Sequence, residues 1–345
     1  MVGQGAVISG LSYLAVGREN VFKTYNTCTA GLPFISCALK TMRESKTIEQ
    51  ISGHRTHSHD IQLQKKIEGE FEGYAFAEAT GMAYLLQNAF GGTITSATAT
   101  GETAGGTAFD HQIDIGNFDQ SISSICLNHR KGDSATGKVF QYNGVRINEL
   151  TFSAEMDEAL KYSTSIVGID STVGSNDVSG ALGSMDFEPL SFVGGRISIA
   201  DSVGSLTTTS YWHVQAAEIG ISNSIKSDSA SGRIGSELLD VLPPGIASFT
   251  FNVTMRFDTT TAYDAMLAGT RLAGEFEFLG STITGSSLRK RIKIVVPKLK
   301  VSDSGDPEIG GPDEFLTSEV AFNVLRDVTL GYAMRLFIRN AISSY

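Results

Sequence analysis

The chain has 345 residues and a formal net charge of −10, with 41% hydrophobic and 19% charged residues. This composition is that of a folded protein rather than a disordered one, and 37 glycines against 7 prolines indicate many tight turns. The acidic balance argues against a protein that grips nucleic acid, because such binding needs Lys and Arg to neutralise phosphates. The length exceeds what one hydrophobic core usually serves, so we expect two domains.

The chain begins with a mildly apolar segment punctuated by glycines, residues 1–20, which we interpret as an extended arm packed against another part of the chain or another copy. It lacks the basic start and the sustained apolar run of a signal peptide. No stretch approaches the roughly 20 apolar residues that cross a bilayer, so no membrane partner is predicted. The cysteines are too few and too irregularly spaced for a disulfide framework, and we expect Cys28, Cys37 and Cys126 to be reduced, buried thiols.

Residues 41–66 form a long polar segment with few apolar anchors, which favours a projecting loop or hairpin. Its histidines and Asp60 have a spacing at which side chains can converge on zinc or another divalent ion. The run resembles the His-x-His-x-Asp-His pattern of metallo-β-lactamase-like hydrolases, but the second Asp-His pair is missing. We therefore predict a solvated loop without a metal, and a metal-dependent hydrolase is the less favoured alternative. The polar side chains of this segment include Arg43, Glu44, His54, His57 and His59.

Residues 67–76 alternate in residue type as a strand does, and residues 78–90 then follow a helical pattern. Within the strand, the period-two spacing of Glu68, Glu70 and Glu72 places all three carboxylates on one face. Like charges on one strand face are destabilising unless that face is in water. The pattern therefore predicts a wet, negatively charged face, which is either an ordinary solvent-facing strand or the lining of a channel.

Most of the remaining chain consists of short β candidates separated by turn residues, with few helical patterns. This combination favours antiparallel sheets packed as a sandwich or barrel. The strand candidates are residues 111–115, 121–127, 138–142, 195–199, 212–219, 291–297 and 316–322.

Parts of the chain recur roughly 175 residues later, which indicates one β-rich module written twice. The strand and helix of residues 67–90 are matched by a strand at 249–257 and a short helix at 262–268. Two further matches join residues 149–155 with 319–325 and residues 162–167 with 332–337. The glycine- and serine-rich run at residues 170–186 separates the copies, so the predicted units are an arm at 1–20, a first domain at 21–175 and a second domain at 176–345.

The second copy repeats two features of the first. Glu275 and Glu277 repeat the alternating carboxylates, and residues 224–244 form a second long polar loop that contains Arg233 and Leu238. Long loops at matching positions of two repeats commonly contact a partner.

No sequence pattern supports catalysis or a cofactor. The chain has no Gly-x-Ser-x-Gly elbow between a strand and a helix, and the glycine-rich runs at 101–106 and 310–311 lack the Lys-Ser/Thr pair of a phosphate-binding loop. We therefore expect no catalytic residues and no cofactor.

The order of these pieces resembles that of the tail tube proteins of long, non-contractile bacteriophage tails (siphoviruses), in particular the double-domain type. The similarity rests on the apolar arm, the polar loop, and the strand leading into a helix with Leu85-Leu86 followed by Gly91-Gly92. It continues through residues 142–147, which open a strand, and through the strand-starting segments 189–199 and 217–225.

The resemblance implies a mainly β fold of two tandem tail-tube-like β-sandwich domains, each flanked by a short α-helix, with long projecting loops. It further implies a virion protein of the tail, made in the host bacterial cytoplasm, that forms trimeric or hexameric rings stacked into a tube. A three-fold ring of double-domain chains would have pseudo-six-fold symmetry. The implied partners are other copies, the tail terminator, tape-measure and distal tail proteins, and double-stranded DNA that passes through without specific binding.

Under this resemblance, the acidic candidates for the channel lining are Glu68, Glu70, Glu72, Glu275 and Glu277. The candidates for contacts between subunits are Arg43, Glu44, His54, His57, His59, Arg233 and Leu238. Carboxylates in a channel would repel phosphate and let DNA slide. The alternatives are a capsid decoration protein, a fibre-base component, the inner tube of a contractile machine or a carbohydrate-binding adhesin.

Overall fold

The computed structural model describes residues 9–50, 53, 55–57, 59–102, 106–115, 122–132, 137–174, 177–182, 185–206, 212–257, 260–304 and 315–345. The fold is mainly β, with 51% of residues in strands, and this confirms the predicted fold class. In the part of the chain that is described, no helix is long and apolar enough to cross a bilayer.

Among the described residues, the first half of the chain contains one α-helix, α1 (Thr80–Phe90), and eleven strands. These strands are β1 (Tyr13–Arg18), β2 (Ala30–Gly31), β3 (Ser36–Cys37), β4 (Lys40–Thr47), β5 (Asp60–Tyr74), β6 (Ile94–Thr98), β7 (Phe109–Asp114), β8 (Ile125–Lys131), β9 (Lys138–Glu155), β10 (Lys161–Gly168) and β11 (Asp170–Gly174).

In the described part of the second half are the helix α2 (Thr261–Ala268) and seven strands. These strands are β12 (Gly195–Ala200), β13 (Val214–Ser222), β14 (Ser248–Arg256), β15 (Arg271–Thr282), β16 (Arg289–Ser304), β17 (Thr317–Val324) and β18 (Arg335–Asn340). Short 3₁₀ helices lie at Ser9–Leu11, Ser179–Ala181, Phe192–Gly194, Val203–Ser205 and Ser229–Ser231.

The same order of antiparallel pairing occurs twice. In the first half, β4 pairs with β5, β5 with β10 and β10 with β9. In the second half, β13 pairs with β14, β14 with β17 and β17 with β16. The strand after each hairpin leads into a helix, from β5 to α1 and from β14 to α2, and both helices end at a glycine with positive φ, Gly91 and Gly269.

A β-bulge occurs at the same place in both copies. The pairing of β10 with β9 skips Asn148, and the pairing of β17 with β16 skips Ser302. The structure therefore equates β9 with β16 and β10 with β17. Two matches predicted from the sequence are therefore wrong, and they are residues 149–155 with 319–325 and residues 162–167 with 332–337. Alternating strand patterns are too similar to one another to show which strands of the two copies are equivalent.

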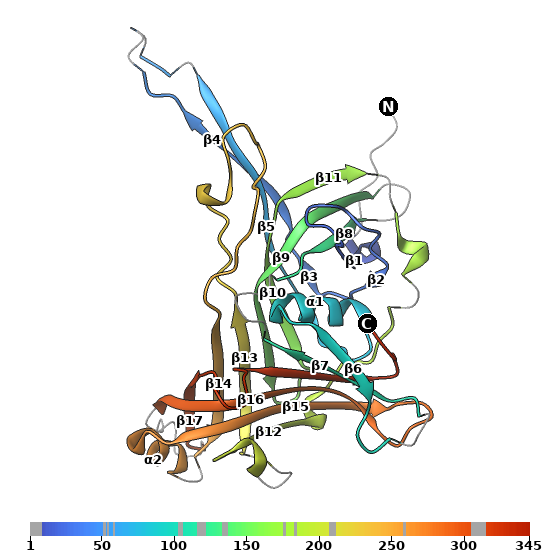
Figure 1. The fold of residues 1–345 in the computed structure, drawn as a ribbon, viewed down its shortest axis with the longest axis vertical. Coiled ribbons are helices and arrows are strands. Elements are labelled where there is room, and N and C mark those ends of the chain that lie inside the picture. The colour runs from blue at the N-terminus through green and yellow to red at the C-terminus, as the bar shows by residue number, and fades with distance from the viewer. Residues whose placement is uncertain are drawn as a thin grey trace.

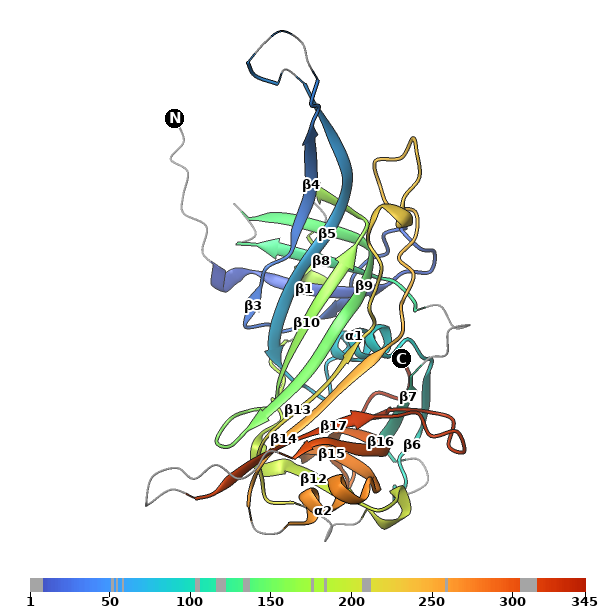
Figure 2. The same ribbon diagram turned by 90° about the vertical axis from the view of Figure 1, so that its left-hand side faces the viewer.

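The two halves share one continuous sheet. Strand β9 pairs with β13 over the whole run from Glu149 opposite Ser222 to Glu155 opposite Ala216. The sheet thus runs β4-β5-β10-β9-β13-β14-β17-β16, and Figure 2 shows most of it nearly face-on with α1 behind it. We call it the long sheet.

A second layer of strands backs each half of the long sheet. Behind the first half lie β2, β1, β8, the start of β9 and β11. Behind the second half lie β12, β15, the start of β16 and β18, and the sheet then continues through β7 into β6. Strands β6 and β7 thus come from the first half of the chain and complete a sheet of the second (Figure 1). The division at residue 175 therefore stays a prediction.

The predicted N-terminal arm is only partly described. Residues 1–8 lie outside the described residues, whereas Tyr13–Arg18 form β1, which pairs with β8 along its full length. Leu14 and Val16 on this strand are completely buried in the main core. The apolar character of residues 13–16 thus reflects packing inside their own chain.

The core lies between the long sheet and the layer behind it. Side chains that alternate along the strands, such as Phe71, Phe152 and Phe251, are buried on the inner face, and α1 contributes Leu85 and Leu86. Burial of the inner face leaves the alternate residues of the long sheet on its outer face.

Helix α1 is tied to β9 by a buried side chain, Asn88. Its Oδ1 accepts a hydrogen bond from the backbone N–H of Ile147 at 2.7 Å, and its Nδ2 donates to the carbonyl of Ser123. Both contacts are inaccessible to solvent at Asn88, whose exposed fraction is 0%.

We predict that Asn88→Ala lowers the free energy of unfolding by about 1–3 kcal/mol, because it leaves the buried backbone N–H of Ile147 without a partner. The measurement is the midpoint of unfolding in guanidinium chloride. Gln87→Ala is the control, since the neighbouring Gln87 is half-buried and its side chain donates a long hydrogen bond, 3.3 Å, to the carbonyl of Gly92. Equal losses for the two variants would contradict the role of Asn88.

Candidate channel face and assembly surfaces

The outer face of the long sheet is polar and carries the predicted run of glutamates. Glu68, Glu70 and Glu72 lie on one face of β5, opposite the buried Ile67 and Phe71. Glu70 and Glu72 are exposed, and Glu68 is half-buried. The period-two pattern thus predicted correctly that these side chains share one outward face.

Small polar side chains continue this face across the neighbouring strands. From Glu70 on β5, the row of directly opposed residues passes through Ser165, Glu149, Ser222 and Ser248. The row therefore crosses both halves of the chain without a break. Serines and threonines are the commonest side chains beside the acids on these strands, so small side chains separate the charged ones.

The outer face has more acidic than basic side chains. Beyond β5, the acids on it are Glu149, Glu155, Glu218, Asp303 and Glu319. The bases are Lys40, Lys66, Lys161, Arg256 and Lys300. Two of these bases are neutralised locally, since Lys66 is 2.6 Å from Glu68 and Lys161 is paired with Glu158. The acids of β9 were not predicted from the sequence. Glu149 and Glu155 are nevertheless an even number of positions apart, so they lie on one face of their strand as the glutamates of β5 do.

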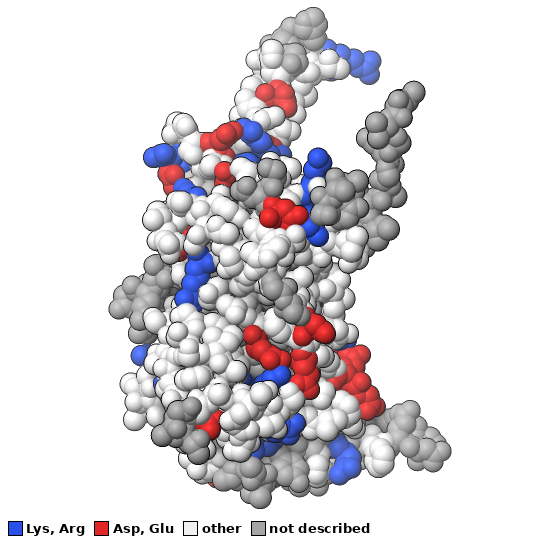
Figure 3. All heavy atoms as spheres, turned by 90° about the vertical axis from the view of Figure 1, so that its right-hand side faces the viewer, with Lys and Arg blue, Asp and Glu red and all other residues white. Residues whose placement is uncertain are grey.

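Acidic side chains also occur away from this face. Figure 3 shows the opposite side of the molecule, where acidic groups gather in the lower half beside a few basic ones and much of the surface is uncharged. Negative charge alone therefore does not single out the long sheet. Its distinguishing feature is that rows of acids and small polar residues continue across both halves of the chain, on a sheet whose other face is buried and largely apolar.

Glu275 and Glu277 have different surroundings from the glutamates of β5. They lie on β15 in the second layer, with exposed fractions of only 4% and 6%. Arg196 is 2.8 Å from Glu277 and also pairs with Glu275, whose second oxygen is 2.5 Å from Lys293. The expectation that these two carboxylates form a wet acidic face is wrong for the isolated chain, because neighbouring strands place cations against them.

These ion pairs belong to a larger network on the second layer. Arg291 lies between Glu277 at 3.4 Å and Asp110 at 3.1 Å. Asp110, on β7, also accepts two hydrogen bonds from Arg339 on β18, at 2.8 and 2.7 Å. The network thus joins strands β15, β16 and β18 of the second half to β7 of the first half.

The environment of Asp110 favours its charged form. Burial by itself would raise the pKa of Asp110, but the hydrogen bond from Arg339 and the positive charges of Arg291 and Arg339 outweigh it. The pKa of Asp110 therefore lies below its ordinary value.

The two predicted contact loops meet each other inside the chain. Arg43 on the β4–β5 hairpin is 2.9 Å from Glu237, next to Leu238 of the second loop. Leu238 is half-buried and forms a bridge with Lys65. Arg233 is exposed and 3.2 Å from Asp240. Their roles between subunits remain predictions.

The histidine run does not form a metal site among the described residues. His57 and His59 are exposed, as is Glu44, and His54 lies outside the described residues. No group of three or more His, Cys, Asp or Glu side chains in the described part of the chain is placed to hold a metal ion. Cys28 and Cys126 are buried, and Cys37 is half-buried.

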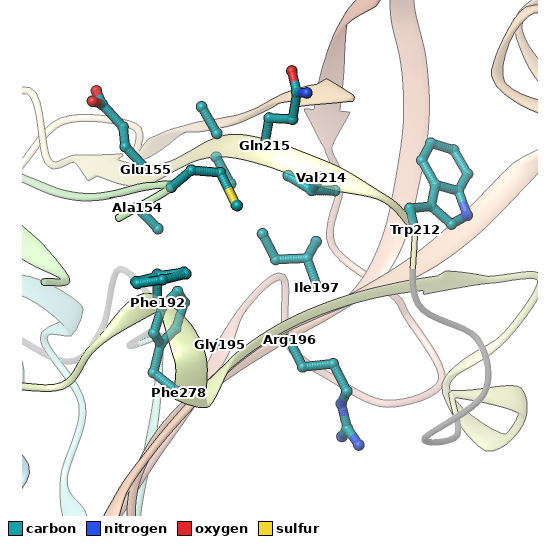
Figure 4. A pocket seen from close by; sticks show the side chains of 13 residues that line it. Ala154, Glu155, Phe192, Gly195, Arg196, Ile197, Trp212, Val214, Gln215 and Phe278 are labelled. Atoms are coloured by element: carbon teal, nitrogen blue, oxygen red, sulfur yellow. The ribbon is translucent and has the colours of Figure 1, made fainter. Parts of the chain in front are cut away.

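A cavity of about 370 Å³ lies between the end of β9, the start of β13 and β12 (Figure 4). Its interior is apolar, with Phe192, Ile197 and Phe278 among its lining residues. The charged side chains at its edge are Glu155 and Arg196, and Figure 4 shows both pointing away from the apolar interior. The lining therefore offers no pair of groups for acid–base or nucleophilic chemistry.

The model of the phage tail tube protein family matches residues 10–324, which is most of the sequence. The chain belongs to this family. No curated protein matches the sequence. A solved structure described as "Crystal structure of Hcp protein" is 15% identical to the tail tube protein, and the match covers 37% of this chain and 86% of the other, with a TM-score of 0.26. That similarity is too weak to add to the assignment.

Family membership confirms the resemblance seen in the sequence. The tail tube protein is a structural component of a phage virion, and it is not an enzyme. Its functional surfaces are therefore those that can contact other copies or line the tube, and the polar face of the long sheet is the candidate for the lining.

For this tail tube protein we predict that Asp110→Asn lowers the free energy of unfolding at pH 7 by about 1.5–3 kcal/mol, the usual range for hydrogen bonds to charged groups. Because the folded pKa of Asp110 is below the unfolded value of about 3.9, its contribution is present above that pH and is lost as the pH falls. The two proteins should therefore converge in stability as the pH falls below that value. Thermal unfolding measured from pH 7 to pH 2 tests this.

Asp201→Asn is the matched control, because Asp201 is an exposed acid outside the network. It should leave stability nearly unchanged at every pH. A difference between Asp110→Asn and the parent protein that stays constant down to pH 2 would contradict the assignment.

Proposed function

We propose that the protein closes into rings that stack into the tube of a long, non-contractile phage tail, with the polar face of the long sheet lining a channel for double-stranded DNA. The observation that carries this proposal is the long sheet itself, which passes from one module to the next within a single chain. Its inner face is covered by the core, and its outer face is polar and acidic.

The sheet has edges that a ring would pair. One edge is formed by β3 and β4, and the other lies at the end of β16, where Val301–Ser304 pair only with β17 among the described strands. Unpaired strand edges attract other chains, and closing the sheet into a barrel between copies removes them.

The pairing inside the chain supplies a template for closure. Since β9 corresponds to β16 and β13 corresponds to β3 and β4, the junction of β9 with β13 would be reproduced between β16 of one copy and β3–β4 of the next. A head-to-tail contact of this kind closes by rotation. Three copies with two modules each would give pseudo-six-fold symmetry, as in the double-domain tube proteins that the sequence resembles.

The charge of the outer face suits passage of DNA without binding. Glu70 and Glu72 on β5 and Glu149 on β9 are exposed carboxylates on either side of strand β10, and they would repel phosphate. A basic lining would instead hold DNA through release of counterions. Glu275 and Glu277 take no part in this proposal, because they are neutralised in the second layer.

The remaining partners follow from the same proposal. The protein would be made in the host bacterial cytoplasm and assembled into the virion tail, where the tape-measure, tail terminator and distal tail proteins would meet the tube. We expect none of these contacts to need a cofactor.

The first experiment is negative-stain electron microscopy of the purified protein over a concentration series. We expect rings or hollow tubes of uniform diameter, with three-fold symmetry in class averages of end views. Compact monomers at every concentration would overturn the proposal, and six copies in a ring would overturn the three-fold part of it.

The channel assignment is tested with phage that carry Glu70→Lys, Glu72→Lys and Glu149→Lys together. We expect tails of normal length and appearance, because these side chains are exposed on the outer face, and slower DNA release after triggering, measured with a DNA-binding dye. A phage with Asp201→Lys, which changes an exposed acid outside the long sheet, is the control. Release at the normal rate from the triple variant would show that this face does not line the channel.

A further inference from the structure

The long loop of the second copy packs against the first module of the same chain. The segment between β13 and β14, residues 223–247, folds over the middle of β9 and the end of β10 in the first module. Its Leu239 and Leu242 are buried against Val167 and Ile169, with exposed fractions of 2% and 1% for the two leucines. The backbone N–H of Lys65 donates to Glu237 at 2.8 Å, which joins the segment to β5.

The corresponding hairpin of the first copy projects from the body of the molecule instead of folding over a module (Figures 1 and 2). The β4–β5 hairpin occupies the same position in the repeat, and its segment, residues 43–65, is nearly as long as residues 223–247. Figures 1 and 2 show it standing away from the body of the molecule. Ile48, Ile61 and Leu63 on it are exposed, at 38%, 48% and 38%.

The second module has a groove at the position that the loop covers on the first. The shared bulge aligns the two modules residue by residue. In this alignment the residues equivalent to Arg146, Val167 and Ile169 are Lys300, Asn323 and Leu325. In the first module this position is covered, since Arg146 donates to the carbonyl of Leu242.

In the second module, none of the described residues covers the same position. A cavity of about 800 Å³ is lined by Lys300, Asn323 and Leu325 together with apolar side chains from α1, β14 and β17 and the segments that flank them. Apolar side chains around and next to it are exposed, and they are Ile246 (77%), Leu325 (42%), Val328 (81%) and Leu330 (48%). Exposed apolar groups gathered at one groove indicate a contact with another chain.

We propose that this groove binds the β4–β5 hairpin of the adjacent copy in the ring, with Ile48, Ile61 and Leu63 as the apolar contacts. The inference rests on the proposed ring. The occupant follows from the repeat, because the strand beside β16 in a closed ring is β4 of the next copy, just as β13 is the strand beside β9 within the chain. The hairpin that leaves β4 is thereby brought to the groove in the way that residues 223–247 are brought to the first module.

Charged side chains on the two surfaces can also form ion pairs. The groove contributes Lys300 and Arg326, and the hairpin carries the exposed acids Glu44 and Glu49 beside the exposed bases Arg43, Lys46 and Arg55. Within the chain, ion pairs likewise hold hairpin and loop together, as between Arg43 and Glu237.

The test is a cysteine cross-link in the assembled protein. Leu63→Cys and Leu325→Cys are combined in a chain with Cys37→Ser, since Cys28 and Cys126 are fully buried. After oxidation of assembled rings with copper phenanthroline, we expect covalent multimers on a non-reducing denaturing gel, at least tenfold more than in the control. The control pairs Leu63→Cys with Val193→Cys, an exposed residue (79%) that precedes β12 at the lower end of Figure 1.

The outcomes separate the inference from the proposed function. Rings seen by electron microscopy without the Leu63–Leu325 cross-link, or with the control cross-link instead, would overturn the docking site and leave the ring intact. Failure of the parent protein to form rings would overturn the proposed function and the inference with it. As a second variant, Leu325→Glu should raise the protein concentration needed for ring assembly at least tenfold, whereas Val193→Glu should leave it unchanged. Equal assembly of the two variants would overturn the docking site.

Discussion

Backbone hydrogen bonding between β9 and β13 is the interaction on which the rest of the structure depends. It joins two copies of one module edge to edge, so that four strands of the first half and four of the second become a single sheet. Pairing of this kind has little dependence on side-chain identity, and it needs only extended backbone with free N–H and C=O groups. A chain that already contains one such junction has the geometry for repeating it between copies.

Two long strands couple the polar face to the body of the protein. Strand β9 pairs with β8 and β11 in its first part and with β10 and β13 in its second part, and β16 likewise pairs first with β15 and β18 and then with β17. In each strand the skipped residue, Asn148 or Ser302, lies in the part that pairs with β10 or β17. A bulge bends a strand and increases its twist. The outer face is therefore held by the same strands that form the core, which suits a surface that must keep its shape over many stacked copies.

Spacing and surroundings make different contributions to the charged sites. Glu70–Glu72 and Glu275–Glu277 have the same alternating pattern, yet the first pair is exposed and the second is buried among Arg196, Lys293 and Arg291. Alternation is a property of the strand, so it fixes which side chains share a face. Whether that face meets water depends on which strands lie beside it, and β12 and β16 supply the cations that neutralise β15. Burial with paired charges makes this network structural rather than a lining.

The sequence by itself determined the local features: the mainly β class, the helix after β5, the shared face of Glu68, Glu70 and Glu72, and the presence of a repeat. These follow from periodicity and turn residues, which act over a few positions. Only the tertiary structure decided that β10 is equivalent to β17, that β6 and β7 complete a sheet of the other half, and that Glu275 is buried. Partners far apart in the sequence are chosen by the burial of whole sheet faces, and the degenerate alternation of a single strand does not encode that choice.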